Sequence, residues 1–246
     1  MPYKILNFFN PEECNIANNE IQQFKELHYK CPHTDMYILG NSLFRKVSFD
    51  NKHIDYGDYF TSNTYNFKTA NLLKDKLKTI FPKVEFTRNF SKPGFQIIKQ
   101  GSTAKPSVWH YDNMLMFFPY ATEFSDYNDN FSEYFDQYFI FTLMLSETGS
   151  FDYYPETKSS FGKNLNDALQ NIPICKSHVN LVGDNCTDIN CSLKEYQTIF
   201  YERGALMVQE ERTLHRIGHR DIDNNLSRTT LQSYGVLKNE ILYLFW

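Results

Sequence analysis

The chain has 246 residues, of which 41% are hydrophobic and 17% aromatic, enough for one large domain with a substantial core. The formal net charge is −4 and no Lys/Arg cluster forms a basic surface, so nucleic acid is not expected as a partner. No apolar run approaches the roughly 20 residues of a membrane span, and the start does not resemble a signal peptide. Together with the odd number of five cysteines, which fits reduced thiols, this predicts a cytoplasmic protein without a membrane partner.

The first third of the chain predicts a strand and two helices. Residues 3–9 have the composition of a strand, and Asn10 then starts a helix: a cap residue is followed by proline and two acids. This helix is expected to run to about Tyr29. A second helix is expected over about 67–80, where apolar residues recur at helical spacing until Pro82 ends it. Short strand-like runs lie between the helices, at 36–39 and 43–49.

The rest of the chain is dominated by strand patterns. An Asn/Asp/Ser-rich stretch at about 155–194 interrupts them, with a short helical run near 164–172, and we interpret it as an insertion that covers part of a site. Helices first and then about eight strands predict one α+β domain on an antiparallel barrel or jelly roll. We therefore expect a single domain (1–246), with a helical N-terminal support region (1–90) and a jelly-roll core (94–246). The strands are expected at 94–100, around His110, and at 133–147, 149–154, 197–201, 205–209, 228–236 and 240–246.

Four His-x-Asp triplets occur in the chain, and they begin at His33, His53, His110 and His219. Of these, the triplet His110-Tyr111-Asp112 lies in a strand-like run, whereas the others lie in turn-like or charged segments. Side chains two residues apart in a strand point to the same face, so His110 and Asp112 would lie side by side. One imidazole and one carboxylate are two of the three ligands in the facial triad that binds non-haem Fe(II).

A second histidine from a distant strand should complete this metal site. His215 is the preferred candidate because residues 214–217 continue the alternating pattern that follows Gly204. His219 competes for the role, although it follows Gly218 at an expected turn. Both histidines therefore remain candidates for the third ligand.

Further motifs follow His110-x-Asp112 in order along the chain: a long apolar strand, Gly204-Ala-Leu-Met-Val, Thr213-Leu-His215-Arg216 and Arg228-Thr-Thr230. Together these motifs resemble the Fe(II)/2-oxoglutarate-dependent dioxygenase superfamily over about Gly94–Leu237. The resemblance implies a double-stranded β-helix (jelly-roll) core and an Fe(II) centre with 2-oxoglutarate as co-substrate and O2 as oxidant. His110, Asp112 and His215 would be the metal ligands and therefore the catalytic residues. The long separation between Asp112 and His215, and the extra polar residues in 216–225, depart from a typical member.

The resemblance also implies an arginine beyond the distal histidine that binds the far carboxylate of 2-oxoglutarate. Arg228 is in that position, and its planar guanidinium can bind a carboxylate through two hydrogen bonds, which lysine cannot match. Thr230, two residues further and so on the same strand face, would add a hydroxyl in place of the serine of the family's Arg-x-Ser pair. Gln96 and Lys99, on an earlier strand, are further candidates for binding the co-substrate.

The resemblance implies hydroxylation of a C–H bond, with desaturation or ring closure as variants. Because the sequence shows no basic groove and no recognisable peptide-binding module, we expect the substrate to be a small polar metabolite such as an amino-acid derivative. Halogenation is not expected, because the halogenases of the superfamily lack the carboxylate that Asp112 supplies. Two alternatives stay open: a hydroxylase of protein side chains with 155–194 as its docking segment, and a cupin-like jelly roll that binds a metal or ligand without turnover. Cupins usually present His-x-His, so Asp112 argues against the last. The sequence names neither the substrate nor the oligomeric state.

Overall fold

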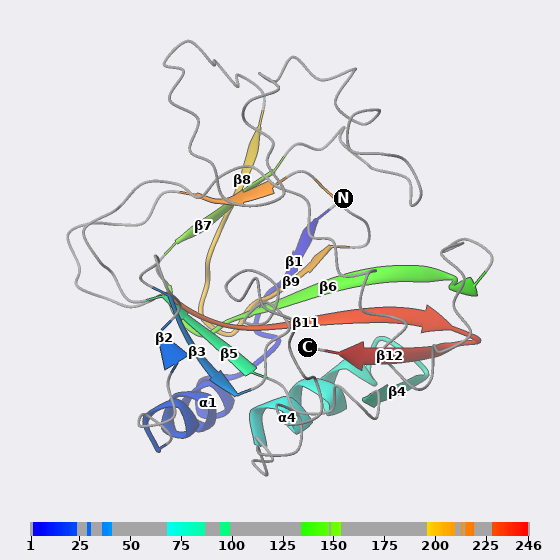
Figure 1. The fold of residues 1–246 in the computed structure, drawn as a ribbon, viewed down its shortest axis with the longest axis horizontal. Coiled ribbons are helices and arrows are strands. Elements are labelled where there is room, and N and C mark those ends of the chain that lie inside the picture. Colours follow the sequence, from blue (N-terminus) through cyan, green and yellow to red (C-terminus); the bar gives the residue numbers. More distant parts are fainter. Residues whose placement is uncertain are drawn as a thin grey trace, which may run out of the picture.

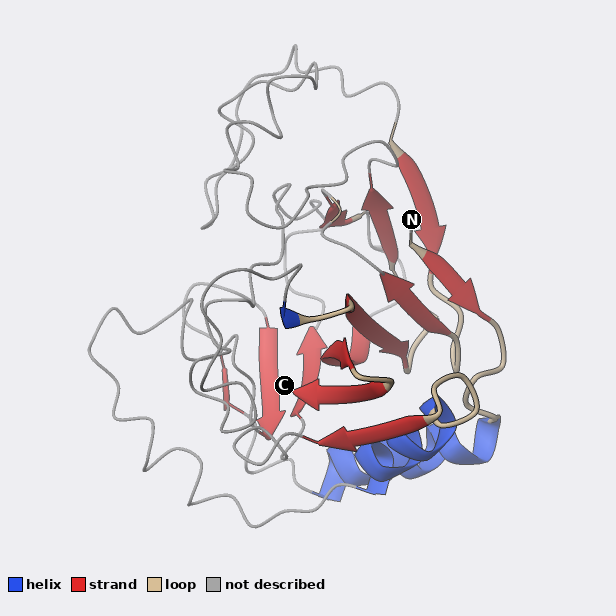
Figure 2. Ribbon diagram, turned by 90° about the vertical axis from the view of Figure 1, so that its right-hand side faces the viewer, coloured by secondary structure: helices blue, strands red, loops and turns tan. Residues whose placement is uncertain are grey.

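The described strands of the computed structural model form two sheets, and two helices pack on the larger one (Figures 1 and 2). The main sheet has the order β1 (Tyr3–Ile5), β9 (Leu206–Gln209), β6 (Gln137–Met144), β11 (Arg228–Lys238), β5 (Gly94–Ile98), β3 (Met36–Gly40) and β2 (Tyr29–Lys30). β12 (Ile241–Phe245) joins it beside β11 and pairs in parallel with β4 (Lys83–Phe86). The smaller sheet has the order β10 (His215–Ile217), β7 (Ser150–Tyr153) and β8 (Gln197–Phe200). The structure describes residues 2–23, 29–30, 36–40, 68–86, 94–98, 134–147, 149–153, 196–209, 213, 215–218 and 228–245.

β11 is the strand that connects the parts of the main sheet. Its residues Arg228–Leu231 pair with β5 and residues Tyr234–Lys238 pair with β12, while β6 runs antiparallel along its other side. Because side chains alternate along a strand, the main sheet has two distinct faces. One face meets the helices, and the inner face is turned toward the smaller sheet (Figure 1).

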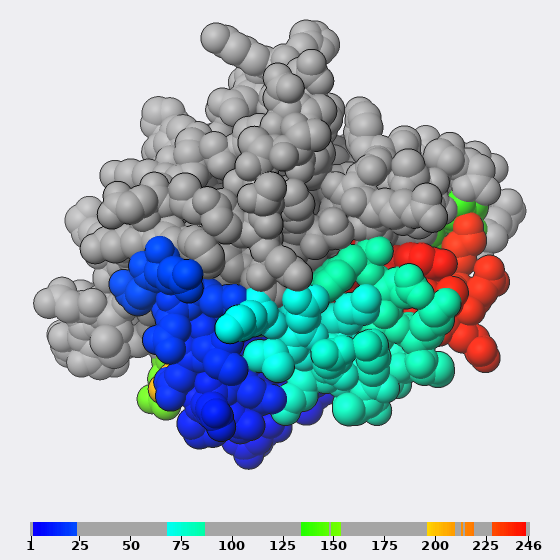
Figure 3. Space-filling view, turned by 90° about the horizontal axis from the view of Figure 1, so that it is seen from below, coloured from blue at the N-terminus to red at the C-terminus, as the bar shows by residue number. Residues whose placement is uncertain are grey.

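The outer face of the main sheet and the helices α1 (Pro11–Gln23) and α4 (Lys68–Leu77) enclose the larger apolar core. Figure 3 shows residues of the two helices, in blue and cyan, side by side on the lower surface, and Figure 1 shows the helices on the side of the main sheet away from the smaller sheet. α1 begins as the sequence predicts: the Glu13 amide donates to Asn10 Oδ1 at 2.9 Å, and the Asn10 amide donates to Glu13 Oε2 at 2.7 Å. The buried core side chains include Cys14, Ala17, Ile21, Leu73, Leu77, Phe139, Phe141, Leu143, Leu206, Val208, Leu242 and Leu244.

α4 has a cap that comes from the other helix. The buried carboxylate of Glu20 accepts hydrogen bonds from the amides of Lys68 and Thr69 and from the Thr69 hydroxyl, at 2.5, 3.0 and 2.6 Å. These amides lie at the N-terminus of α4, where the first turn has no partners within the helix and a negative charge is favourable. Glu20 therefore holds the two helices in a fixed arrangement beneath the sheet.

Most of the predicted elements in the described ranges are confirmed, with differences at their ends. The expectation that the first helix reaches Tyr29 is wrong, because Tyr29 begins β2. The first strand ends at Ile5, since Asn7 has a φ of 52° and Phe9 turns to donate its amide to the Gly204 carbonyl. β4 was not predicted. The predicted strand at 43–49, the strand around His110 and the 155–194 insertion lie outside the described residues. Of the helices in the described part of the chain, none is long and apolar enough to cross a membrane.

Candidate functional site

His215 is buried at the start of β10, in the smaller sheet. Its ring stacks on Phe151 with 4.8 Å between centroids, and its Nδ1 lies 2.8 Å from the Thr213 carbonyl oxygen. A carbonyl oxygen can only accept, so Nδ1 carries a proton, and in the neutral form of the imidazole Nε2 is the nitrogen with the lone pair. A histidine that ligates a metal through one nitrogen commonly donates from the other to such a carbonyl.

The position of His215 corrects one expectation. The sequence suggested that it continues the strand after Gly204, but β9 lies in the main sheet and β10 pairs with β7 in the smaller sheet. The chain thus crosses between the sheets after Gln209. As a result, His215 projects from the sheet opposite to the one that carries Arg228.

Arg228 is buried at the start of β11, on the inner face of the main sheet. Its Nη2 donates to the Tyr201 hydroxyl, and its guanidinium carbon lies 4.7 Å from the centroid of the Tyr201 ring. Its Nε and Nη1 are buried and have no hydrogen-bond partner among the described residues. Buried guanidinium groups are normally paired, so this arrangement indicates that an anionic group is needed to complete it.

Gly149, just before β7, makes room for this arginine. Its φ is +118°, and a Cβ at this position would lie 3.2 Å from Arg228 Cδ. The Tyr201 amide donates to the Gly149 carbonyl, which ties the ring of Tyr201 to the same place. Two loop residues from the smaller sheet therefore fix the arginine that comes from the main sheet.

Thr230 follows on the same face of β11 and is also incompletely paired. Its Oγ1 is buried and has no partner among the residues that the structure describes. In the backbone register Thr230 lies opposite Gln96 of β5 on one side and Met144 of β6 on the other. Two neighbouring positions of the inner face therefore carry buried unpaired groups: the Nε and Nη1 donors of Arg228 and the hydroxyl of Thr230.

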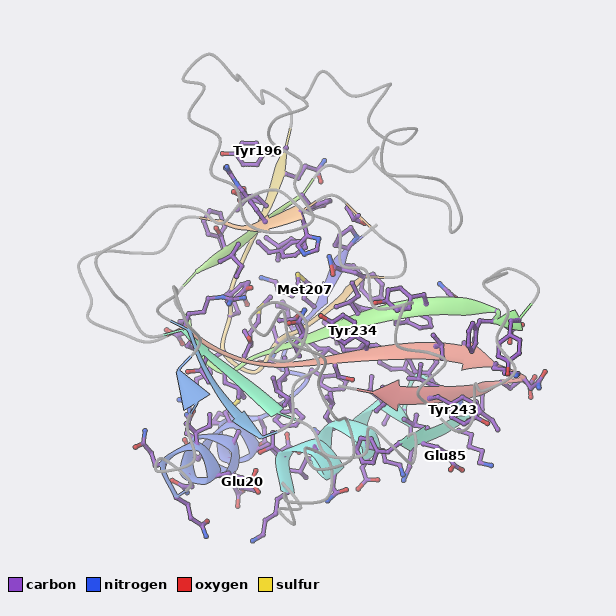
Figure 4. The ribbon with its side chains drawn as sticks, in the orientation of Figure 1. Glu20, Glu85, Tyr196, Met207, Tyr234 and Tyr243 are labelled. Atoms are coloured by element: carbon purple, nitrogen blue, oxygen red, sulfur yellow. The ribbon has the colours of Figure 1, made fainter. Side chains whose placement is uncertain are left out.

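Arg228 and His215 lie near opposite ends of β7. Gly149 contacts Arg228, and Tyr153, four residues along, lies opposite His215 in the register. At about 3.3 Å per residue, the two backbone positions are about 13 Å apart. Phe151, between them, stacks on His215 and belongs to an apolar cluster with Met144, Tyr201 and Met207. Figure 4 shows Met207 and Tyr234 in the space between the two sheets.

Side-chain hydrogen bonds on the outer side of the smaller sheet link its three strands. The buried carboxylate of Asp152 accepts from Arg216 Nε at 2.9 Å and from the Thr198 hydroxyl at 2.8 Å. On the inner side, the Tyr153 hydroxyl donates to Gln197 Oε1 at 2.6 Å, and burial raises the pKa of Tyr153 above its usual value. These cross-strand contacts fix β10, and with it the orientation of His215.

The structure thus places three of the predicted site residues, His215, Arg228 and Thr230, around the space between the sheets. The backbone of Gln96 lies at the same sheet position as Thr230. His110, Asp112, Lys99 and the competing His219 lie outside the described residues, so their roles stay predictions. Sequence reasoning missed Tyr201 and Gly149, since neither has a local pattern that connects it to Arg228.

No family model and no curated protein sequence matches the chain. Solved structures do match, each with probability 1.00 and at low identity. The chain has the fold of non-heme, alpha-ketoglutarate-dependent enzymes. The matches include the epimerase SnoN from nogalamycin biosynthesis (9% identity, TM-score 0.50, 96% of this chain and 80% of that chain), the carbocyclase SnoK from the same biosynthesis (8%, 0.51, 96% and 79%) and HygX from Streptomyces hygroscopicus with nickel and 2-oxoglutarate bound (12%, 0.53, 95% and 82%).

Proposed function

We propose that this protein is an Fe(II)- and 2-oxoglutarate-dependent oxygenase that oxidises a C–H bond of a small polar molecule. Hydroxylation is the default outcome, with desaturation or ring closure as variants of the same chemistry. The observation that carries the proposal is the buried Arg228, whose Nε and Nη1 have no partner among the described residues.

The residues at Arg228 fit the far carboxylate of 2-oxoglutarate. Tyr201 accepts a hydrogen bond from Nη2, and the three N–H donors of Nε and Nη1 have no partner among the described residues. The unpaired hydroxyl of Thr230 is one strand position away on the same face. An isolated buried charge costs several kcal/mol, so a carboxylate ligand stabilises this arrangement strongly.

The other end of the co-substrate would lie toward His215. The separation of about 13 Å along β7 leaves room for a dicarboxylate between Arg228 and a metal at His215. Nε2 of His215 would be one ligand, and His110 and Asp112 would be the other two. Two neutral imidazoles and one ionised carboxylate would suit Fe(II) and would leave part of its coordination open for co-substrate and oxygen.

The topology supports a double-stranded β-helix around this site. From β6 to β11 the chain passes from the main sheet to the smaller sheet and back, twice, and the inner faces of both sheets enclose Met144, Phe151 and Met207. In this enclosed site, iron and 2-oxoglutarate would supply the oxidant, with 2-oxoglutarate and O2 converted to succinate, CO2 and one oxygen atom for the substrate. The chain's own residues orient the co-substrate and keep water out.

The experiment is the anaerobic addition of Fe(II) and 2-oxoglutarate to the purified protein, which should produce the weak visible charge-transfer band of the chelate. His110→Ala and Asp112→Ala should abolish the band. The separate variants His215→Ala and His219→Ala identify the third ligand, and we expect the loss with His215. If the wild type shows no band and no thermal stabilisation by the two ligands, the protein is a jelly roll without this activity.

A further inference from the structure

The inner face of the main sheet has a second unpaired polar group, far from Arg228. Gln209 ends β9 and is only 1% exposed, and its side-chain Nε2 has no hydrogen-bond partner among the described residues. A buried amide without a partner costs about 1–3 kcal/mol. Such groups are rare in folded proteins, and each one calls for a ligand or another specific cause.

The register places Gln209 at the end of the site opposite to Arg228. Gln209 lies across from Ile140 of β6, and Ile140 lies across from Tyr234 of β11. Tyr234 is four residues beyond Thr230 on the same strand face, a distance of about 13 Å. Gln209 thus lies well beyond the position of the co-substrate carboxylate.

His215 follows Gln209 closely in the sequence. Residues 210–214 connect Gln209 to His215, and this length of chain can span at most about 20 Å. Along β7, His215 is also displaced away from Arg228. Gln209 and His215 are therefore each displaced from Arg228 along their own sheets, and the short connection keeps their backbones within about 20 Å of each other.

The surrounding charges limit what can bind there. On the inner face of β6, β9 and β11 the charged side chains are Arg228 and Lys238, both cationic, and these three described strands place no carboxylate on that face. Lys238 lies at the far end of β11, with its Nζ 3.4 Å from the centroid of the Tyr134 ring. A cationic substrate would find no counter-ion on this face, whereas a neutral or anionic one is compatible with it.

We propose that Gln209 is a substrate-binding residue whose amide donates to an oxygen acceptor, an amide carbonyl or a carboxylate, of a neutral or anionic substrate. This inference rests on the proposed function, since it takes Arg228 and His215 as the positions of co-substrate and metal. Gln209 orients the substrate so that the C–H bond to be oxidised faces the metal.

The first measurement is the melting temperature of the metal-free protein. Gln209→Met has nearly the volume of glutamine but no amide, so it should leave the melting temperature unchanged or raise it by a few degrees. The matched control is Gln232→Met, on the inner face of β11. The Gln232 side chain is only half-buried and has no buried polar atom that lacks a hydrogen bond. This control should not be stabilised. If Gln209→Met instead lowers the melting temperature by more than about 5 °C, its amide has a structural role and the inference is wrong.

The second measurement uses protein labelled with 15N-glutamine and saturated with N-oxalylglycine and Zn(II), a diamagnetic ion that does not broaden the signals of nearby amides. The signal that disappears in Gln209→Met identifies the Gln209 amide, and three probes are then added: N-acetylglycinamide, N-acetylglycine and glycinamide. The neutral and anionic probes should shift this signal downfield, with dissociation constants at least tenfold below that of cationic glycinamide. If no probe moves the signal, or if glycinamide binds as well as the others, the inference fails. N-oxalylglycine binding is read from the same samples, so its absence would refute the proposed function instead.

Discussion

Replacing Arg228 with methionine should separate the stability of the fold from co-substrate binding. In the ligand-free protein the substitution removes the hydrogen bond to Tyr201, but it also removes a buried cation with two unpaired nitrogens. Replacing buried charged groups by apolar ones of similar size is often neutral or stabilising. We therefore expect the free energy of unfolding without ligand to change by less than about 1.5 kcal/mol.

The same substitution should weaken the binding of N-oxalylglycine, an analogue of 2-oxoglutarate, by a large factor. Each hydrogen bond to a charged group contributes about 1.5–3 kcal/mol, so losing two of them costs about 3–6 kcal/mol. Since about 1.4 kcal/mol is tenfold, N-oxalylglycine should bind about 10²- to 10⁴-fold more weakly. Arg228→Lys keeps the charge but not the planar fork, and it should weaken binding by at least about tenfold.

The assay is thermal unfolding with Mn(II), with and without N-oxalylglycine at about one hundred times the wild-type dissociation constant. The wild type should gain about 2.7 kcal/mol, or roughly 5–10 °C in a chain of this size. Arg228→Met should gain less than about 2 °C. The reasoning is refuted if the variant keeps the full stabilisation, or if it loses more than about 3 kcal/mol without ligand, as a structural arginine would.

Three further substitutions test contacts around the site. Tyr201→Phe keeps the ring beside Arg228 but removes the hydroxyl, whose own proton can reach the carboxylate, and should weaken N-oxalylglycine binding about tenfold by titration. Gly149→Ala should lower stability by about 1–3 kcal/mol in urea unfolding, because φ is +118° there, and should weaken the same binding by displacing Arg228. Glu20→Gln leaves an N-terminal amide of α4 without an acceptor and should cost about 2–4 kcal/mol in urea unfolding. The exposed Glu12→Gln is its control, and a loss below 1 kcal/mol for Glu20→Gln would contradict the capping role.

The sequence by itself determined most of the elements, because their signals are local. The cap at Asn10 predicted the start of α1, and a long apolar run predicted β6. Arg228 and Thr230 fall on one face of β11 because they are two residues apart, which any strand would produce. The roles of these two residues, and of His110, Asp112 and His215, remain proposals.

Tertiary structure alone decided the contacts that join distant segments. β4 has too short a pattern to be predicted and forms because β12 provides a parallel edge. His215 was expected to extend the strand after Gly204, but the chain crosses to the other sheet, a choice that depends on how the two sheets close. The same holds for Glu20 at α4 and for Tyr201 beside Arg228. Such pairs leave no periodic trace in the sequence, because each depends on the packing of elements far apart in the chain.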